Sequence, residues 1–126
     1  SFMEHPEKAL SAAAIKYLLT IAELCGKRPG ARCVDIAGRM GVSKPGAHSM
    51  IRNLCEAGLA EKERYGTVSL TDAGREAAEL YASCYRPLCS RMQEALGLEE
   101  ETCRNVACAV LAEEQERLPE LALRLK

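Results

Sequence analysis

The sequence predicts a mainly α-helical fold in which three short helices and a two-stranded hairpin precede a second group of helices. Apolar residues recur at helical spacing through most of the chain, and glycines or prolines stand where these stretches end. Only residues 60–70 contain two short strand-like runs around a turn. The chain has 126 residues, of which 48% are hydrophobic, so one compact domain with a packed core is expected. No apolar run approaches the ~20 residues that cross a bilayer, so a membrane protein is not expected.

The first helix is expected from Ser11 to Cys25. Ser11 can cap its N-terminus, and Gly26 can end it because glycine tolerates the backbone conformation found after a helix. Pro29-Gly30 then predicts a turn. The helical spacing is expected to place one set of its residues on the buried face, namely Ala14, Tyr17, Leu18, Ile21, Leu24 and Cys25.

The next two helices are short and follow each other closely. The second is expected over residues 33–40, and Gly41 suits the left-handed residue that ends a helix. The third begins after Ser43, a good N-cap, with Pro45 in its first turn, and it ends at Gly58. The inward-facing residues are expected to be Val34, Ala37 and Met40 from the second helix and Ala47, Ile51 and Leu54 from the third.

A hairpin is expected after the third helix. Its strands are Ala60–Arg64 and Thr67–Leu70, with Tyr65-Gly66 at the turn. A helix, a glycine-containing turn and a second helix with a polar outer face form the arrangement of a helix-turn-helix. With the hairpin as a wing, residues 1–72 are expected to form a winged helix-turn-helix domain that binds DNA.

The rest of the chain, residues 73–126, is expected to be a helical dimerisation domain. Thr71 can cap a long helix that reaches about residue 95, and Pro87 within it is expected to kink or split that helix. Further helices are expected over Glu99–Ala112 and from Pro119 to Leu125. A symmetric dimer interface would cover apolar side chains that so thin a layer cannot bury by itself, namely Leu88, Met92, Leu96, Val110, Leu111, Leu121 and Leu125.

Charge and cysteine content fit an intracellular protein with two functional segments. Residues 1–70 carry a net charge of +3 and residues 71–126 a net charge of −4. The seven cysteines are odd in number, and no secretory segment precedes them, so they are expected to be reduced thiols in the cytoplasm. No C-x-x-C pair is present, which argues against a zinc ribbon or a thioredoxin-like motif.

No catalytic constellation is present. The two histidines, His5 and His48, are far apart in sequence, and both are expected at the surface. There is no nucleophile elbow, phosphate-binding loop or dinucleotide-binding motif, so neither an enzyme nor a small-molecule substrate is expected.

The order of these elements resembles a known family. The stretch "VDIAGRMGVSKPGAHSMIRNLCEAGLAEKERYGTVSLTDAGRE" resembles the metal-dependent repressors, which include the diphtheria toxin repressor, the iron-dependent regulators and the manganese transport regulator. The later "LGLEEETCRNVAC" resembles their dimerisation helices, so the similarity covers roughly residues 10–125. The resemblance implies a homodimeric regulator whose two winged helices bind a palindromic operator in double-stranded DNA.

The outer face of the third helix supplies the candidate DNA-binding residues. Small polar side chains near a helix N-terminus can reach base edges, while basic side chains and backbone N–H groups hold phosphates. A solvated polar face, or a winged-helix module that binds protein instead of DNA, is the alternative interpretation; Lys27, Arg28 and Arg32 favour DNA. The candidate residues are Ser43, Lys44, Pro45, His48, Ser49 and Arg52 on the helix and Arg64 and Tyr65 at the wing tip.

The metal site is where the sequence departs from the family pattern. Only Cys108 keeps a family ligand type, and Cys89 is a chemically possible replacement for an acid. Two thiols are poor ligands for Mn²⁺ or Fe²⁺, which favour oxygen and nitrogen. We therefore expect either no cofactor, with the cysteines as small buried residues, or a sensor for a thiophilic metal ion or for oxidation. The other matched ligand positions hold Lys16, Leu19, Tyr85, Arg104, Val106, Leu111 and Ala112.

Overall fold

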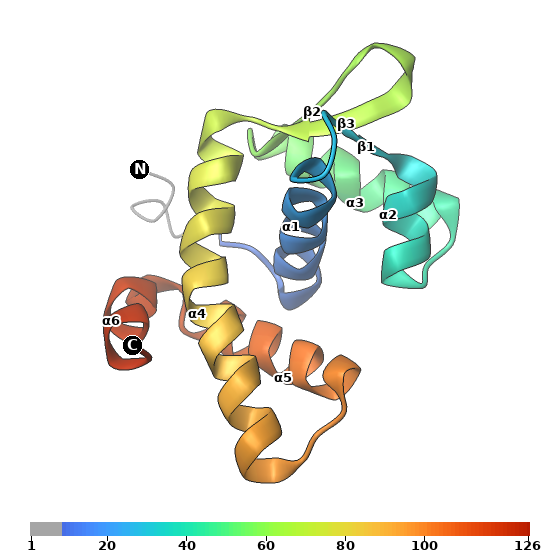
Figure 1. Cartoon of the computed structure of the whole chain (residues 1–126). Helices are drawn as coiled ribbons and strands as arrows, with labels where there is room; N and C mark the ends of the chain where they lie inside the picture. The colour runs from blue at the N-terminus through green and yellow to red at the C-terminus, as the bar shows by residue number, and fades with distance from the viewer. Residues whose placement is uncertain (1–8) are drawn as a thin grey trace. The chain divides into compact units, whose positions relative to one another are not determined.

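A computed structural model describes residues 9–126, so His5 lies outside the described part of the chain. The described residues are mainly helical (Figure 1), and none of their helices is long and apolar enough to cross a membrane. Two 3-10 turns, η3 (Arg64–Gly66) and η4 (Gln115–Arg117), interrupt the regular elements. The helices are α1 (Ala12–Cys25), α2 (Cys33–Met40), α3 (Lys44–Glu56), α4 (Asp72–Leu96), α5 (Glu100–Glu113) and α6 (Leu118–Arg124), and the strands are β1 (Ala31–Arg32), β2 (Ala60–Lys62) and β3 (Thr67–Leu70).

The chain forms two compact units. The winged unit comprises Tyr17–Ala78, and the helical unit comprises the N-terminal segment up to Lys16 together with Glu79–Lys126. The division falls within α1 and within α4, so each of these helices contributes residues to both units.

The sheet of the winged unit has three antiparallel strands in the order β1-β3-β2. The expected hairpin is present, with Ala60 opposite Leu70, but its first strand ends at Lys62 because the chain turns into η3. A two-stranded wing was expected, and the structure adds β1, in which Ala31 lies opposite Val68. The chain reaches this position through Gly30, whose φ of 77° suits glycine.

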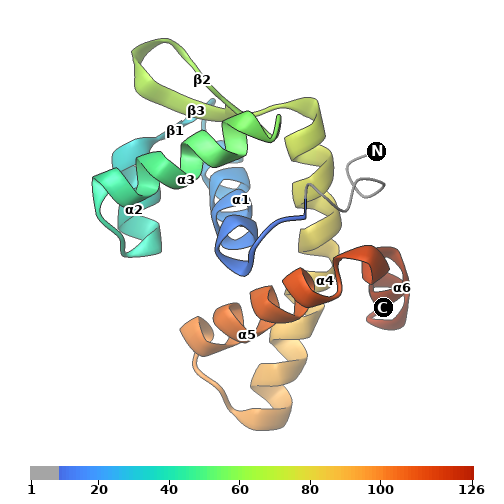
Figure 2. The same ribbon diagram turned by 180° about the vertical axis from the view of Figure 1, so that it is seen from behind.

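The helices α2 and α3 form the helix-turn-helix beside this sheet, and α3 packs against both α2 and β2 (Figure 2). Gly41 ends α2 with a φ of 67°, as expected from the sequence. The Ser43 side chain caps α3 by accepting a hydrogen bond from the Gly46 N–H at 3.2 Å. The predicted inward stripe of α3 is confirmed, because Ala47, Ile51 and Leu54 are all buried.

The predicted inward face of α2 is wrong at one position. Val34 is 45% exposed, whereas Ile36 is fully buried together with Ala37. Ile36 lies about 200° around the helix axis from Val34, so the two cannot share a face. In a helix of only two turns, the apolar pattern alone did not determine which of them faces the core.

The start of α4 is fixed to the strand that begins the wing. The Thr71 N–H donates to the Leu59 carbonyl at 3.1 Å, and the Thr71 hydroxyl donates to the Gly58 carbonyl at 2.6 Å. The same hydroxyl caps α4 by accepting from the Gly74 N–H at 3.0 Å. Gly74 is buried, and a Cβ placed on it would lie only 1.9 Å from the Leu59 carbonyl oxygen. The two backbones can therefore approach this closely only with glycine at position 74.

The helical unit buries one face of α4 and α5. Pro87 was expected to kink or split the long helix; the helix is not split, because α4 runs from Asp72 to Leu96 with Pro87 inside it. The buried apolar residues of the unit are Leu10, Ala14, Ile15, Tyr81, Cys84, Cys103, Ala107, Cys108, Leu111 and Leu118.

A buried amide joins the two ends of the described chain within the helical unit. Gln115 Oε1 accepts from the Leu10 N–H at 2.7 Å and from the Tyr81 hydroxyl at 2.9 Å. Its Nε2 donates to the carbonyls of Leu10 at 2.7 Å and Ala112 at 2.9 Å. Every hydrogen-bonding direction of this amide is therefore used, as a buried polar group requires.

The close approach at Gly74 predicts a large effect of a single methyl group. Gly74→Ala forces the Leu59 carbonyl and the start of α4 apart, and it should lower the free energy of unfolding by at least ~2 kcal/mol. Gly38→Ala in α2 is the matched control, because nothing lies within 4 Å of its added Cβ. The control should be neutral or more stable by up to ~1 kcal/mol. Urea unfolding of both variants measures the difference in the free energy of unfolding. Equal stability of the two would contradict the close contact between Gly74 and the Leu59 carbonyl.

Candidate functional site

The outer face of α3 is open to solvent along most of its length. Lys44, Pro45, Ser49 and Arg52 are exposed, and so is the capping residue Ser43. The buried stripe on the opposite side of the helix holds this face outward. The first turn of the helix also presents backbone N–H groups, which attract anions such as phosphate.

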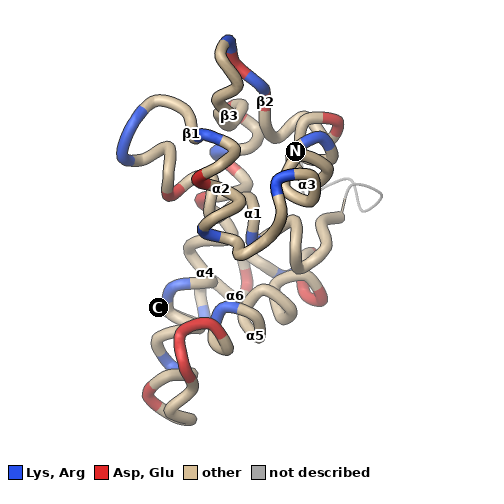
Figure 3. Tube along the Cα trace, turned by 90° about the vertical axis from the view of Figure 1, so that its right-hand side faces the viewer, with Lys and Arg blue, Asp and Glu red and all other residues tan. Residues whose placement is uncertain are grey.

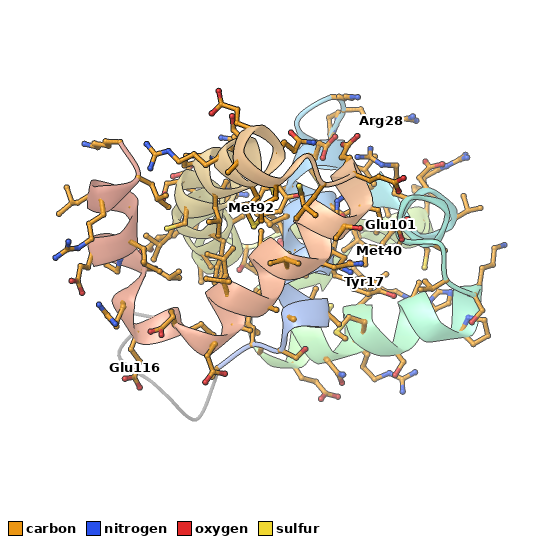
Figure 4. The ribbon with its side chains drawn as sticks, turned by 90° about the horizontal axis from the view of Figure 1, so that it is seen from below. Tyr17, Arg28, Met40, Met92, Glu101 and Glu116 are labelled. Atoms are coloured by element: carbon orange, nitrogen blue, oxygen red, sulfur yellow. The ribbon has the colours of Figure 1, made fainter. Side chains whose placement is uncertain are left out.

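Basic residues are also exposed on other elements of the same unit. Lys27 and Arg28 lie in the exposed turn between α1 and β1, Lys62 is the last residue of β2, and Arg64 lies in the η3 turn that follows it. Figure 3 shows these basic segments, and Figure 4 shows the Arg28 side chain extending away from its loop. Arg32 on β1 is also exposed. Together with Lys44 and Arg52, these side chains give the winged unit positive charge on several elements.

The wing tip presents a strained aromatic residue. Tyr65 is 94% exposed, and it is the one non-glycine residue of the described chain with a positive φ, 69°. Gly66 follows with a φ of 79°, so the expected turn consists of two consecutive left-handed residues. The left-handed conformation costs a non-glycine residue roughly 1–2 kcal/mol. An exposed ring at such a position contributes little burial in return.

His48 was expected on the open face of α3, but it is half-buried. Its Nδ1 and Nε2 atoms lie 3.7 and 3.6 Å from the Cys33 Sγ atom. The Lys62 Nζ atom is 3.3 Å from Nδ1. The sequence does not indicate that Cys33 and Lys62 are neighbours of His48, because no local pattern connects residues that come from α2, α3 and β2.

The two cysteines proposed as metal ligands lie close together in the helical unit. Cys89 on α4 is half-buried and Cys108 on α5 is buried, and the charge of a Cys89 thiolate contributes to the raised pKa of Cys108. Burial raises the pKa of Cys108 to about 11 and also raises the pKa of Cys89. Burial raises the pKa of Tyr85 to about 12, although its hydrogen bond to Arg104 acts in the opposite direction.

Cations occupy the surroundings of these thiols. The Arg104 guanidinium and the Lys16 ammonium both act on Cys108 and favour its charged form. Lys16 Nζ also donates to Asn105 Oδ1 at 2.5 Å, which fixes the ammonium on the α5 side chain. A metal ion would therefore meet two fixed positive charges near the two thiols.

The residues present do not fit the metal that the family resemblance implies. Among residues 9–126, no three His, Cys, Asp or Glu side chains are grouped so that they could hold a metal ion. Mn²⁺ and Fe²⁺ need several oxygen or nitrogen ligands, and binding must compete with protons on any thiol. Protonated thiols and neighbouring cations both oppose such binding.

The apolar residues expected at a dimer interface differ in exposure. Leu96 is 67% exposed, while Leu88, Met92, Val110, Leu121 and Leu125 are half-buried. Leu111 is fully buried within its own unit, so it is not available for an interface as expected. The structure adds Leu123, which is 68% exposed, and Val106, which is 39% exposed.

The fold is shared with several solved structures. IdeR of T. acidophilum is 22% identical, with a TM-score of 0.67, over 88% of this chain and 51% of its own. The manganese regulator SloR is 21% identical, with a TM-score of 0.65, over 86% of this chain and 54% of its own. The hypothetical protein SSo2273 from Sulfolobus solfataricus is 21% identical, with a TM-score of 0.62, over 92% of this chain and 89% of its own.

This similarity is structural. The chain spans about half the length of IdeR and SloR. No family profile matches the sequence, and no curated protein is significantly similar to it. At these identities the comparisons show a common fold.

The strained wing tip predicts that one substitution stabilises the fold. Tyr65→Asn should raise the free energy of unfolding by about 0.5–1 kcal/mol, because asparagine tolerates the left-handed conformation that tyrosine does not favour. Tyr65→Ala is the control, since it removes the ring but keeps an unfavourable residue in that conformation. Chemical denaturation distinguishes the two, and a loss of stability in Tyr65→Asn would show that the ring supports the wing instead.

Proposed function

We propose that this protein is a homodimeric DNA-binding transcriptional regulator that binds a palindromic operator through its winged helix-turn-helix. The observation that carries the proposal is the capped, solvent-exposed face of α3 with Lys44 and Arg52. It occurs in a fold that is shared with the manganese regulator SloR. The alternative function is a winged-helix module that binds a protein without binding DNA sequence-specifically.

The proposed recognition helix is α3, which would enter the major groove. Ser43, Pro45, His48 and Ser49 would face the base edges near its N-terminal half. Lys44 and Arg52 would contact the phosphates on either side and fix the position of the helix. Arg64 and Tyr65 at the wing tip would contact the backbone or the minor groove.

Dimerisation is the second part of the proposal. Residues 1–72 would bind DNA, and residues 73–126 would hold two copies together around a two-fold axis. Exposed Leu96 and Leu123, with the half-buried apolar residues beside them in the sequence, supply the apolar surface for a self-complementary interface. Two winged units related in this way would bind half-sites about one helical turn apart.

The salt dependence of binding separates DNA recognition from protein recognition. The double variant Lys44→Ala/Arg52→Ala should weaken binding to all duplexes and reduce the steepness of the salt dependence by about four units of log–log slope, because each of the two chains loses two phosphate contacts. Ser49→Ala should instead change base preference. The control is Arg86→Ala, an exposed arginine of α4 outside the proposed interface. Binding sites are first selected from random duplexes, then titrated at several salt concentrations.

The same samples report the stoichiometry. Sedimentation of the complex should give two chains per duplex, and sedimentation of the free protein at micromolar concentration should give a dimer. Weak, salt-independent association that is equal in the wild type and the double variant would contradict the proposed function and favour the protein-binding alternative.

We further propose that Mn²⁺ and Fe²⁺ are not required for DNA binding. Lys16 and Arg104 place positive charge near Cys89 and Cys108, where an ion would need anionic ligands. Each buried thiol must also lose a proton before it can bind a metal. An effector, if one is used, would be a thiophilic ion or a thiol oxidant that acts on Cys89 and Cys108.

Removal of metal therefore should not change DNA affinity. Chelator-treated protein should bind the selected operator as tightly as untreated protein, and added Mn²⁺ should not strengthen binding. If a thiophilic ion alters DNA affinity, Cys89→Ser/Cys108→Ser should abolish that response, with Cys55→Ser as the control. Calorimetric titration decides the matter, and tight stoichiometric Mn²⁺ binding that switches on DNA binding would overturn this expectation.

A further inference from the structure

Three reactive side chains from different elements of the winged unit meet beside the proposed recognition helix. Cys33 is the first residue of α2, His48 lies on α3, and Lys62 ends β2. The Cys33 Sγ atom lies 3.6 Å from His48 Nε2, and Lys62 Nζ lies 3.3 Å from His48 Nδ1. We name this group the Cys33 cluster. All three side chains remain at least partly exposed to solvent.

The lysine determines which tautomer of His48 fits. A protonated ammonium group has only hydrogen-bond donors, so His48 Nδ1 must act as the acceptor toward Lys62. The neutral ring then carries its hydrogen on Nε2, the nitrogen nearer to Cys33 Sγ. The Cys33 Sγ atom is almost equally distant from the two ring nitrogens, so it lies beside the imidazole ring and not at the end of one N–H bond.

The position of Cys33 at the start of its helix is a further feature of the cluster. The first residues of an α-helix lie at the positive end of the helix dipole, which stabilises a thiolate. Arg32 is the N-cap of α2, and no side chain caps the free N–H groups of this turn. The ammonium of Lys62 adds positive charge behind the His48 ring. The helix end and the ammonium therefore both place positive charge on the side of Cys33 that contacts the His48 ring.

The remaining cysteines lie in less favourable surroundings. Cys103 is buried, with its Sγ atom 3.8 Å from the Leu98 carbonyl, and the Cys25 thiol donates to the Val68 carbonyl at 3.6 Å. Desolvation raises the pKa of Cys25, Cys55, Cys84, Cys89 and Cys108. A thiol that stays protonated is a poor nucleophile.

We propose that Cys33 is a modification site, at which the protein undergoes thiol–disulfide exchange with low-molecular-weight disulfides. The Cys33 thiolate attacks one sulfur of the small disulfide and forms a mixed disulfide, while the sulfur–sulfur bond of the reagent breaks. The second half of the reagent leaves as a thiolate and takes a proton from water. The reagent disulfide is the only oxidant that this step needs. A small thiol reverses the step by reducing the mixed disulfide on Cys33.

The effect on DNA binding rests on the proposed function. An adduct on Cys33 would lie against His48 on α3, and it would displace the ring or hold it in a new position. If the adduct carries carboxylates, as oxidised glutathione would supply, it also places negative charge beside the surface proposed to contact phosphates. We therefore expect modification of Cys33 to weaken duplex binding reversibly.

The kinetic test requires no DNA. An aryl disulfide that releases a coloured thiolate, 5,5′-dithiobis(2-nitrobenzoic acid), is mixed with native wild-type protein in a stopped-flow instrument. One thiol per chain should react at least about tenfold faster than the others, since the rate follows the thiolate fraction. Cys33→Ser should remove this fast phase and Cys89→Ser should leave it unchanged. His48→Ala and Lys62→Met should both slow it, with circular dichroism to establish that each variant is folded.

The second test joins the modification to DNA binding. Wild type and Cys33→Ser are treated with oxidised glutathione, the adduct is located by peptide mass spectrometry, and binding to the selected duplex is measured before and after addition of a reducing thiol. Treatment should weaken binding at least about tenfold in wild type only, and reduction should restore it.

The outcomes separate the two proposals. A fast phase that survives in Cys33→Ser, or an adduct on another cysteine, overturns the modification site whether or not the protein binds DNA. If untreated wild type fails to bind any duplex, the proposed function is wrong while the kinetic result still decides the site. If wild type binds DNA equally with and without the Cys33 adduct, the regulatory effect is overturned.

Discussion

The winged unit depends on the contact between the Leu59 carbonyl and the first turn of α4. Thr71 donates to this carbonyl through its backbone N–H, and Gly74 leaves the space into which the carbonyl oxygen projects. Because a hydrogen bond and a backbone-to-backbone approach act at the same atom, the beginning of β2 and the beginning of α4 cannot shift independently. Both strands of the wing lie between these two points in the sequence, so the contact fixes the ends of the segment that carries the wing.

The proposed interface takes its geometry from burial on the opposite side of the same elements. Ala47, Ile51 and Leu54 anchor α3 in the core, and their spacing leaves Lys44, Ser49 and Arg52 in solvent. The side chains that would contact DNA therefore contribute little to the stability of the unit. They can change with limited effect on the fold, which separates the requirements of specificity from those of stability. Tyr65 is the exception, since its backbone conformation is unfavourable for the residue that occupies it.

Features with a local physical cause could be predicted from the sequence, and features that join distant segments could not. Ser43 and Thr71 as caps, Gly41 as a helix end and the buried stripe of α3 all follow from residues within a few positions of one another. The strand β1 could not be found because two residues have no detectable period and their partners lie across the fold. The same reason applies to the buried amide network of Gln115 and to the helix that continues through Pro87.

In the candidate site, too, the locally determined features could be predicted and the contacts between distant segments could not. The periodicity of α3 identified its outer face, and the structure places Lys44, Ser49 and Arg52 there. His48 also lies at a position of α3 whose helical spacing predicts an outward side chain. It is half-buried because Cys33 and Lys62 approach it from other elements. For the proposed metal ligands, matching positions to a family identified Cys89 and Cys108 and placed Lys16 and Arg104 beside them. The sequence could not show that Arg104 acts on both thiols and Lys16 on Cys108 alone.

The hydrogen bonds between Gln115 and Leu10 have a consequence for the order in which the protein is made. They join residues 105 positions apart, and the helical unit that contains them is assembled from both ends of the described chain. The winged unit is continuous in sequence and lies entirely between those ends. During synthesis it can fold as soon as its own residues leave the ribosome, whereas the N-terminal segment must wait for α5 and η4 before its buried amide partner exists. The unit proposed to bind DNA would therefore fold before the unit proposed to bring two copies together.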